Sequence, residues 1–478
     1  MAADYLHGVE TIELPIGSVP IRVVKSAVIG LVGIAPNGPK QTLTLVQSQA
    51  DAAQFGKNLP GFNIPHALEA IQKQGAGTVL VVNVFSATDH TVSVTETKTV
   101  ANGKFKLTNP HIVDADADMD LELNDGATPT PAVFVKGDDY TVDDFGNVVI
   151  IPTGNISNGD KVTCVYNRLD TTAVANADII GAITSGVRTG FQVFELAYQT
   201  FGFTPRIFIA PGYSAVKAIA SEMEVKAGEF NAHAIIDSTA SALPATVISD
   251  RGDITEAFGT SSKRAILTYP RLKAYDEYTD DDAVVPFSPY LAGVIAATDN
   301  TDGYWFSPSN RQIKGITGVE RTITSAINNA QTEANLLNEA GIVTVFNSFG
   351  TGLRVWGNRS AAFPTSTAPS NFIAVQRVAD ILHESVELAQ LEFIDKPINT
   401  ALIDAIRETV NGFIRTLIGR GAIVDGECTY DPAKNPPSEL AAGHLTFDIT
   451  FMPPTPAERV TFESFIDVNL LAALNSSN

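Results

Sequence analysis

The sequence is poor in cysteine and in basic residues. Only Cys164 and Cys428 occur in 478 residues, which excludes the disulfide framework of small secreted domains and favours folding in a reducing compartment. The 32 Lys and Arg residues against 53 Asp and Glu residues give a net charge of −21. Because proteins that bind nucleic acid neutralise phosphates with a basic surface, this charge argues against a nucleic-acid partner.

Export signals and long apolar runs are also lacking. The N-terminus shows neither the basic region nor the apolar stretch of a signal peptide, which predicts assembly in the cytoplasm. The longest near-apolar stretches, 26–39 and 283–298, are shorter than the roughly 18 residues that a membrane helix needs, and Gly or Pro interrupts both. We therefore expect no direct insertion into a membrane.

Three motifs approach a chemical signature without completing it. Segment 33–40 resembles a phosphate-binding loop, but Pro39 stands where the lysine is required. Segment 383–387 has Glu387 where a zinc-binding helix needs its second histidine. The acidic run from Asp114 has Met119 where a calcium loop needs glycine. We therefore expect no cofactor, no metal and no enzymatic activity. The sequence does not decide whether the acidic region 111–144 binds ions or a partner.

The apolar pattern predicts a multidomain α/β fold with an all-β insertion. Apolar strands alternate with amphipathic helices in 26–87 and again in 173–355, which indicates one α/β core in two parts. The second part includes a helix predicted over 175–200. Region 88–172 instead has short β-runs separated by Asn-Gly, Asp-Gly and Gly-Asn turns, typical of a β-sandwich or barrel. Two amphipathic helices and two strands predict a C-terminal α+β domain over 356–464.

Both ends of the chain read as strands without a partner nearby in sequence. We predict an N-terminal extended arm over 1–25 and a C-terminal arm over 465–478. In the C-terminal domain, alternation predicts strands over 445–451 and 460–468. Isolated amphipathic strands are marginal in water, so pairing between subunits would satisfy them.

Several segments together resemble the contractile tail sheath proteins of bacteriophages with myovirus morphology. They are 26–36 (SAVIGLVGIAP), 204–212 (TPRIFIAPG), and 336–344 (LLNEAGIVT) followed by 353–359 (LRVWGNR). The strands over 445–451 and the Pro453-Pro454 pair extend the similarity to the C-terminus. The resemblance covers the chain apart from 88–170, and its strength lies in the order and spacing of the segments.

The resemblance implies a structural subunit. Sheath proteins stack as six-fold rings in a helical polymer around a tail tube, between the baseplate and the neck terminator. They contract from a metastable extended state and drive the tube through the host envelope. The C-terminal domain would then polymerise around the tube, within a virion assembled in the host cytoplasm. An α/β enzyme and a self-assembling surface-layer protein or adhesin remain the alternatives.

The resemblance also implies which residues lie between subunits. In that family the arms pair with strands of neighbouring C-terminal domains. Mapped onto this sequence, the interface comprises arm and receiving-strand positions: Ile12, Leu14, Ile16, Val19, Ile21, Val23, Leu445, Phe447, Ile449, Phe451, Val460, Phe462, Ile466, Val468 and Leu470.

Overall fold

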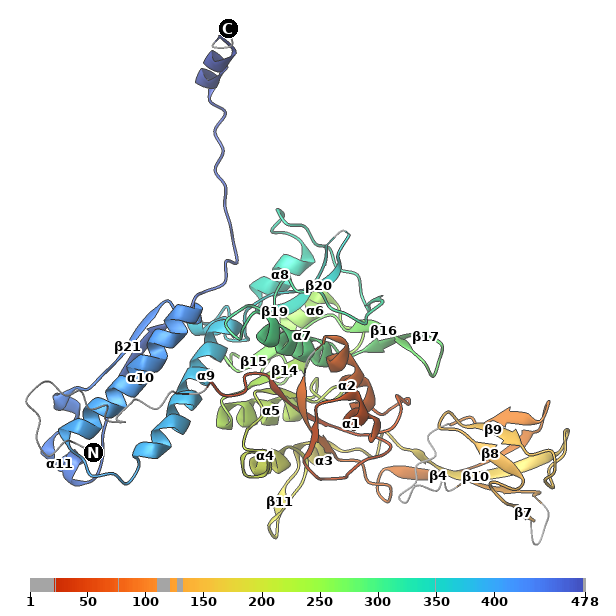
Figure 1. Ribbon diagram of the computed structural model, residues 1–478. Coiled ribbons are helices and arrows are strands. Elements are labelled where there is room, and N and C mark those ends of the chain that lie inside the picture. Colours follow the sequence, from red (N-terminus) through yellow and green to blue (C-terminus); the bar gives the residue numbers. More distant parts are fainter. Residues whose placement is uncertain are drawn as a thin grey trace, which may run out of the picture.

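An eight-stranded sheet lies at the centre of the computed structural model, which describes residues 21, 23–75, 77–109, 121–126, 132–348 and 350–475 (Figure 1). The strand order is β2-β3-β1-β13-β14-β15-β19-β20. The inner strands are parallel, and the two edge strands are antiparallel to their neighbours. The bounds are β1 (Val28–Gly33), β2 (Thr44–Val46), β3 (Thr78–Asn83), β13 (Ile207–Ile209), β14 (His233–Asp237), β15 (Ala265–Thr268), β19 (Ile342–Ser348) and β20 (Gly352–Trp356).

Helices cover both faces of this sheet. Helices α1 (Gln49–Ala53), α2 (Ile64–Lys73) and α7 (Ser288–Thr301) lie on one face, and α5 (Lys217–Glu229) lies on the other. Burial on both faces explains why the parallel strands are continuous apolar runs. Strand β13 follows the insertion in sequence yet pairs with β1, which precedes it. The two parts therefore form one sheet, as the alternation of strands and helices predicts.

The inserted region forms two small sheets that share one core. One sheet has the order β4-β10-β6-β7 and the other β5-β9-β8. Leu123 and Cys164 of the first meet Tyr140 and Val148 of the second. Of the two alternatives, sandwich or barrel, the described strands form the two-sheet arrangement and no barrel. The bounds are β4 (Thr91–Thr99), β5 (Lys104–Lys106), β6 (Glu122–Asn124), β7 (Val133–Phe134), β8 (Tyr140–Val142), β9 (Asn147–Ile150) and β10 (Lys161–Leu169).

The insertion projects to one side of the central sheet (Figure 1). Its contact with the body includes Phe145, whose ring centroid lies 6.1 Å from that of Tyr278. Tyr278 lies near the hairpin formed by β16 (Leu272–Asp276) and β17 (Asp281–Val285). Residues 114–120 of the predicted acidic run lie outside the described residues.

The single helix predicted over 175–200 is wrong. The chain instead forms α3 (Asn176–Ile180), a hairpin of β11 (Ile183–Thr184) and β12 (Val187–Arg188), a 3-10 helix η1 (Gly190–Leu196) and α4 (Ala197–Phe201). Gly181, Ser185, Gly186 and Gly190 all have positive φ. Because right-handed helix requires negative φ, these residues interrupt the helix that the apolar spacing predicts.

Two antiparallel helices build the C-terminal domain. Helix α9 (Ile373–Gln390) and helix α10 (Thr400–Arg420) bury the apolar faces that their sequences predict. The side chain of Asn399 accepts a hydrogen bond from the backbone N–H of Leu402, which caps the start of α10, and Gly421 ends it in the left-handed region. A two-stranded sheet of β21 (Asp425–Thr429) and β22 (Asp448–Met452) contacts these helices.

One face of α9 joins the C-terminal domain to the central sheet through three ion pairs. Arg377 binds Asp299 of α7 with two contacts of 2.7 and 2.5 Å. Asp380 binds Arg264, which precedes β15, at 2.6 and 2.9 Å. Glu384 binds Arg206, which precedes β13. Arg377, Asp380 and Glu384 share one helix face because they are spaced by three and four residues.

We expect the substitution Arg377→Ala to lower the free energy of unfolding by about 3–5 kcal/mol, because it leaves the carboxylate of Asp299 buried without its partner. The side chains of Arg377 and Asp299 are only 4% and 1% exposed. Urea denaturation followed by circular dichroism measures the change.

The matched control is Arg415→Ala, which removes an exposed arginine of α10 that pairs with Glu408. Exposed ion pairs contribute about 1 kcal/mol or less. Equal losses from the two substitutions would show that the α9 ion pairs do not hold the domains together.

Candidate subunit interface

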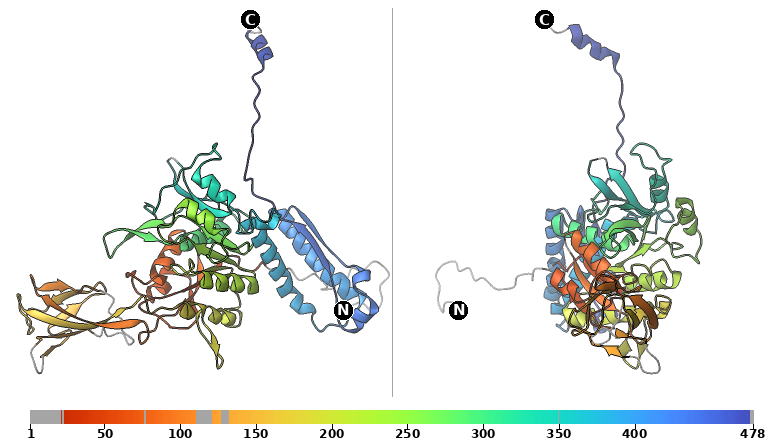
Figure 2. Two further views of the ribbon diagram at one scale, coloured as in Figure 1. Left: turned by 180° about the vertical axis from the view of Figure 1, so that it is seen from behind. Right: turned by 90° about the vertical axis from the view of Figure 1, so that its right-hand side faces the viewer.

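The C-terminal segment, residues 459–475, leaves the body of the molecule. Figure 2 shows it as an extended strand-like trace that ends in η5 (Val468–Asn475). Phe462 is 89% exposed and Ile466 is fully exposed. The ion pair between Arg359 and Glu458 holds the chain just before this segment. A row of large apolar side chains therefore stands in water with its backbone extended.

The resemblance implies that 460–464 belong to a receiving strand of the C-terminal domain and that the arm begins at 465. In the described residues no strand pairs with 453–467, so this prediction is wrong for the isolated chain. Pro453, Pro454 and Pro456 end the ladder of β22, because proline has no N–H and a fixed φ. The strand predicted after them has no partner among the described residues. Val460 and Phe462 thus lie in the C-terminal segment, and Val468 and Leu470 lie in its helical end.

Of the N-terminal arm, the predicted positions Ile12, Leu14, Ile16 and Val19 lie outside the described residues. Ile21 and Val23 are half-buried against the apolar cluster of α9 and α10. The N–H of Val24 donates a hydrogen bond to the hydroxyl of Ser385 on α9. The N-terminal arm therefore enters the fold beside the helices that carry the β21–β22 sheet.

The two outer edges of the β21–β22 sheet differ. On β21, the backbone N–H of Cys428 donates to the side-chain oxygen of Asn411 at 2.8 Å, and its carbonyl accepts from the Asn411 amide nitrogen at 2.9 Å. Asn411 lies on α10, so its side chain covers the β21 edge as another strand would. Sequence analysis missed this residue, since one asparagine in an amphipathic helix gives no signal.

In an antiparallel pair, the backbone groups of successive residues point alternately toward and away from the partner strand. This alternation fixes the direction of the N–H and C=O groups on β22. Cys428 stands opposite Ile449, and the backbone of Cys428 points away from β22. Their pair is therefore of the non-hydrogen-bonded kind, and the N–H and C=O of Ile449 point away from β21. Phe451, two residues on, points the same way. The predicted receiving residues Phe447, Ile449 and Phe451 are half-buried against the α9–α10 cluster, and Leu445 is half-buried before β22 begins.

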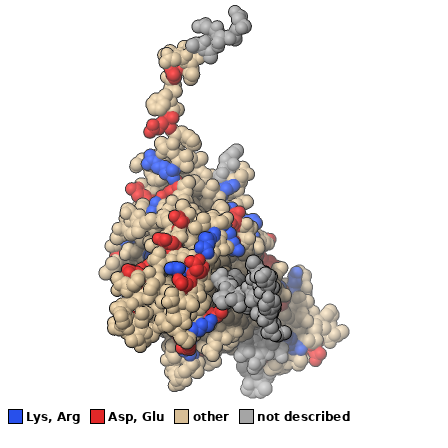
Figure 3. Space-filling model, turned by 60° about the vertical axis from the view of Figure 1, so that its left-hand side comes forward, with Lys and Arg blue, Asp and Glu red and all other residues tan. Residues whose placement is uncertain are grey.

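Charges on this side of the molecule are mixed. Figure 3 shows Lys and Arg interspersed with Asp and Glu over the face that is turned forward, without one extended patch of a single sign. On α10, Arg407 contacts both Asp404 and Glu408. This mixture favours recognition through apolar groups and backbone over attraction between oppositely charged surfaces.

Two residues of the zinc-like segment 383–387 make structural contacts. Glu384 of the zinc-like segment pairs with Arg206, and the ring of His383 packs on Phe451. The described residues contain no group of three or more His, Cys, Asp or Glu side chains suited to hold a metal. No helix among them is long and apolar enough to span a bilayer.

Two family models match most of the body. The phage tail sheath protein central domain matches residues 173–361, and the phage tail sheath C-terminal domain matches residues 365–467. The tail sheath protein of Burkholderia phage BcepMu is 43% identical over 485 residues, covering 100% of both chains. The chain belongs to the phage tail sheath family.

More distant sheath proteins are also similar to this chain. The tail sheath protein of Escherichia phage P2 is 25% identical over 99% of this chain and 100% of its own length. A solved sheath complex of an extracellular contractile injection system, PVC, in its contracted state has a TM-score of 0.60. It is 14% identical and covers 98% of this chain and 99% of its own. At that identity the likeness shows that this sheath protein has the fold of that sheath subunit.

We expect Asn411→Ala to expose the β21 edge of the sheath protein. Without the amide, the backbone groups of Cys428 lose both hydrogen bonds, at a cost of about 1–3 kcal/mol. Hydrogen–deuterium exchange of the peptide that contains Cys428 should accelerate about tenfold or more, since tenfold corresponds to roughly 1.4 kcal/mol.

Thr416→Ala on the exposed face of α10 is the control and should leave this exchange rate unchanged. Unaltered protection in the Asn411 variant would mean that the amide does not cover the β21 edge.

Proposed function

We propose that this chain is the structural subunit of a contractile tail sheath that polymerises by exchanging terminal strands. The observation that carries the proposal is the exposed C-terminal segment, whose apolar side chains have no strand partner in the described part of their own subunit. The subunit works as a mechanical part and not as an enzyme. Family membership favours this function over an α/β enzyme or a surface-layer protein.

Burial of the C-terminal segment by a neighbour supplies the driving force. Each large apolar side chain that leaves water contributes about 1.5–3 kcal/mol. Phe462, Phe465 and Ile466 are all more than four-fifths exposed. Ordering of the backbone costs about 1–2 kcal/mol per residue, so the strand needs backbone hydrogen bonds as well as apolar contacts to bind. An open sheet edge supplies both.

Among the described residues no second strand pairs with β22, and we assign the incoming strand to this edge. Asn411 covers β21, whereas the backbone groups of Ile449 point away from it. A strand from a neighbour would extend the sheet along β22. The N-terminal arm would provide a further strand, since Ile21 and Val23 pack against the α9–α10 cluster that β22 also contacts. Its predicted interface positions are Ile12, Leu14, Ile16, Val19, Ile21 and Val23. The segment that donates the strand differs from the sheet edge that receives it, so the contact is heterologous. Such a contact repeats from subunit to subunit and builds a ring or a helix.

Contraction follows from two packings of the same subunit. The strands keep neighbours linked while the bodies reorient, and a small free-energy difference per subunit adds up over the polymer. The α9 ion pairs make the central and C-terminal domains move together. No nucleotide is consumed, because assembly on the tail tube traps the extended state. A helical stack of six-fold rings, the tail tube, the baseplate and the terminator are the partners that this function requires, in a virion assembled in the host cytoplasm.

We expect a chain ending at Glu458 to fold and to remain unpolymerised. Residues 459–471, which the truncation removes, are exposed. The melting temperature should therefore stay within about 2 °C of that of the full chain, whereas negative-stain microscopy should show tubes or stacked rings only for the full chain. Regular tubes from the truncated chain would contradict strand exchange.

Substitutions within the C-terminal segment test whether polymerisation needs its apolar side chains and not only its length. The double substitution Phe462→Asp and Ile466→Asp should abolish tubes, because both side chains need an apolar neighbour. Thr461→Asp, in the same segment, should leave tube formation intact.

A further inference from the structure

The β11–β12 hairpin is a small projection at one end of the central domain (Figure 1). Its two-residue turn, Ser185-Gly186, has φ of 50° and 84°, as a type I′ turn requires. A two-stranded hairpin alone is marginally stable in water. The β11–β12 hairpin therefore needs support from its base or from a partner to stay folded.

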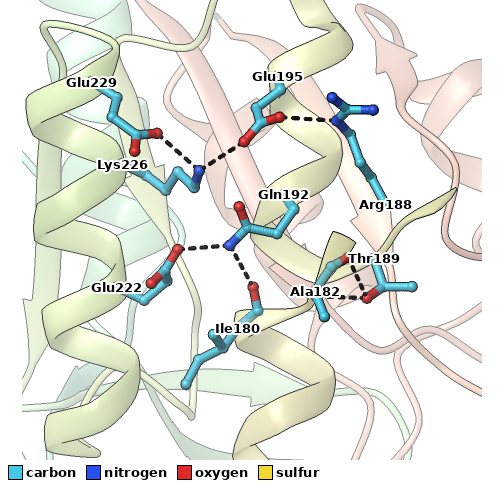
Figure 4. Close-up of polar contacts among 9 residues, drawn as sticks. All are labelled: Ile180, Ala182, Arg188, Thr189, Gln192, Glu195, Glu222, Lys226 and Glu229. Atoms are coloured by element: carbon cyan, nitrogen blue, oxygen red, sulfur yellow. Dashed lines mark hydrogen bonds and ion pairs between the residues drawn. The ribbon is translucent and has the colours of Figure 1, made fainter. Parts of the chain in front are cut away.

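A polar network supports the base of the hairpin (Figure 4). The N–H groups of Ala182 and Thr189 donate across the neck, to the Thr189 hydroxyl and the Ala182 carbonyl. Arg188 of β12 donates to Glu195 at 2.9 Å. Glu195 also binds the ammonium of Lys226 at 3.2 Å.

The network reaches into α5. The ammonium of Lys226 also binds Glu229 at 2.8 Å, and its side chain is only 4% exposed. Burial favours a lower pKa for Lys226, but the hydrogen bonds to Glu229 and Glu195 outweigh it and raise the pKa. Gln192 links the Ile180 carbonyl to Glu222. The hairpin is thus fixed to the domain through η1 and α5.

Apolar side chains stand on both faces of this fixed hairpin. Ile183 pairs with Arg188, and Thr184 pairs with Val187, so Ile183 and Val187 lie on opposite faces. Ile183 is 51% exposed and Val187 is 65% exposed. An anchored projection with apolar groups on both faces suits insertion against another surface.

The opposite end of the central domain exposes a second apolar set. Leu243 directly precedes α6 (Pro244–Asp250), Ile254 follows that helix, and Ile327 lies in the loop before α8 (Glu333–Glu339). Ile254 is 80% exposed and Ile327 is 86% exposed. Helices α6 and α8 pack together. We call this set the α6–α8 patch. Figures 1 and 2 show the α6–α8 region at the upper end and the hairpin at the lower end.

The C-terminal segment gives the direction of the neighbour. It leaves the body beside the C-terminal domain and then runs toward the upper end, past the level of α8 (Figures 1 and 2). A copy in the same orientation on that side would present its own hairpin to the α6–α8 patch. Two different surfaces at opposite ends make a heterologous contact that repeats without closing on itself as a dimer.

We propose that the β11–β12 hairpin docks on the α6–α8 patch of a second copy of this chain. The contact is separate from the exchange of terminal strands, although it rests on the proposed polymerisation. Ile183 and Val187 supply its apolar core. Local apolar contacts of this kind would offset the mutual repulsion between copies of net charge −21.

Cross-linking tests the contact directly. Variants that each add one cysteine, Val187→Cys and Ile254→Cys, are mixed, assembled into tubes and treated with a short bismaleimide. The two native cysteines are buried, so they should react little. We expect a covalent dimer in tubes and none in dissociated subunits. The control mixture, Val149→Cys with Ile254→Cys, should give no dimer, because Val149 lies in the insertion.

Charge substitution gives an independent readout. Ile183→Asp combined with Val187→Asp should reduce the amount of assembled tube at least tenfold with an unchanged melting temperature. Val149→Asp, at a site of similar exposure (49%), should assemble normally. Normal tubes from the hairpin variant, without the cross-link, would overturn this inference and leave strand exchange standing. Failure of the unmodified chain to form tubes would overturn both.

Discussion

Apolar side chains on an extended strand cannot remain in water in a finished assembly, and this constraint organises the sheath subunit. The C-terminal segment carries Phe462, Phe465 and Ile466 almost fully exposed, and no strand pairs with 453–467 among the described residues. The subunit is therefore incomplete by construction. We propose that a second copy completes it and that the need for that copy repeats along the polymer.

The rest of the chain forms a rigid body that positions the C-terminal segment. The α/β sheet is buried on both faces, and α9 binds it through Arg377, Asp380 and Glu384. Helix α10 then covers one edge of the β21–β22 sheet with Asn411. These contacts, with the ion pair between Arg359 and Glu458, fix where the C-terminal segment begins. They also support the proposal that the edge of β22, and not that of β21, receives a strand. A rigid body with linked ends can change its packing and stay connected.

Much of this architecture is predictable from periodicity. The apolar strands around β1, β13, β14 and β15 and the amphipathic faces of α9 and α10 are local patterns, and the structure confirms them. The hairpin at Ser185-Gly186 was missed because helix-like spacing of apolar residues masked its glycines. The strand predicted over 460–468 has the correct alternation, but periodicity cannot say which chain will pair with it. Asn411 was not predictable, because its role depends on the contact between α10 and Cys428.

The most direct test of strand exchange is a cryo-electron microscopy structure of tubes assembled from the full chain. Our account predicts that the β21–β22 sheet gains a strand along β22, formed by residues near Phe462 and Ile466 of a neighbouring subunit. The edge of β21 would remain bound to Asn411. A C-terminal segment folded onto its own subunit, or an added strand along β21, would contradict it.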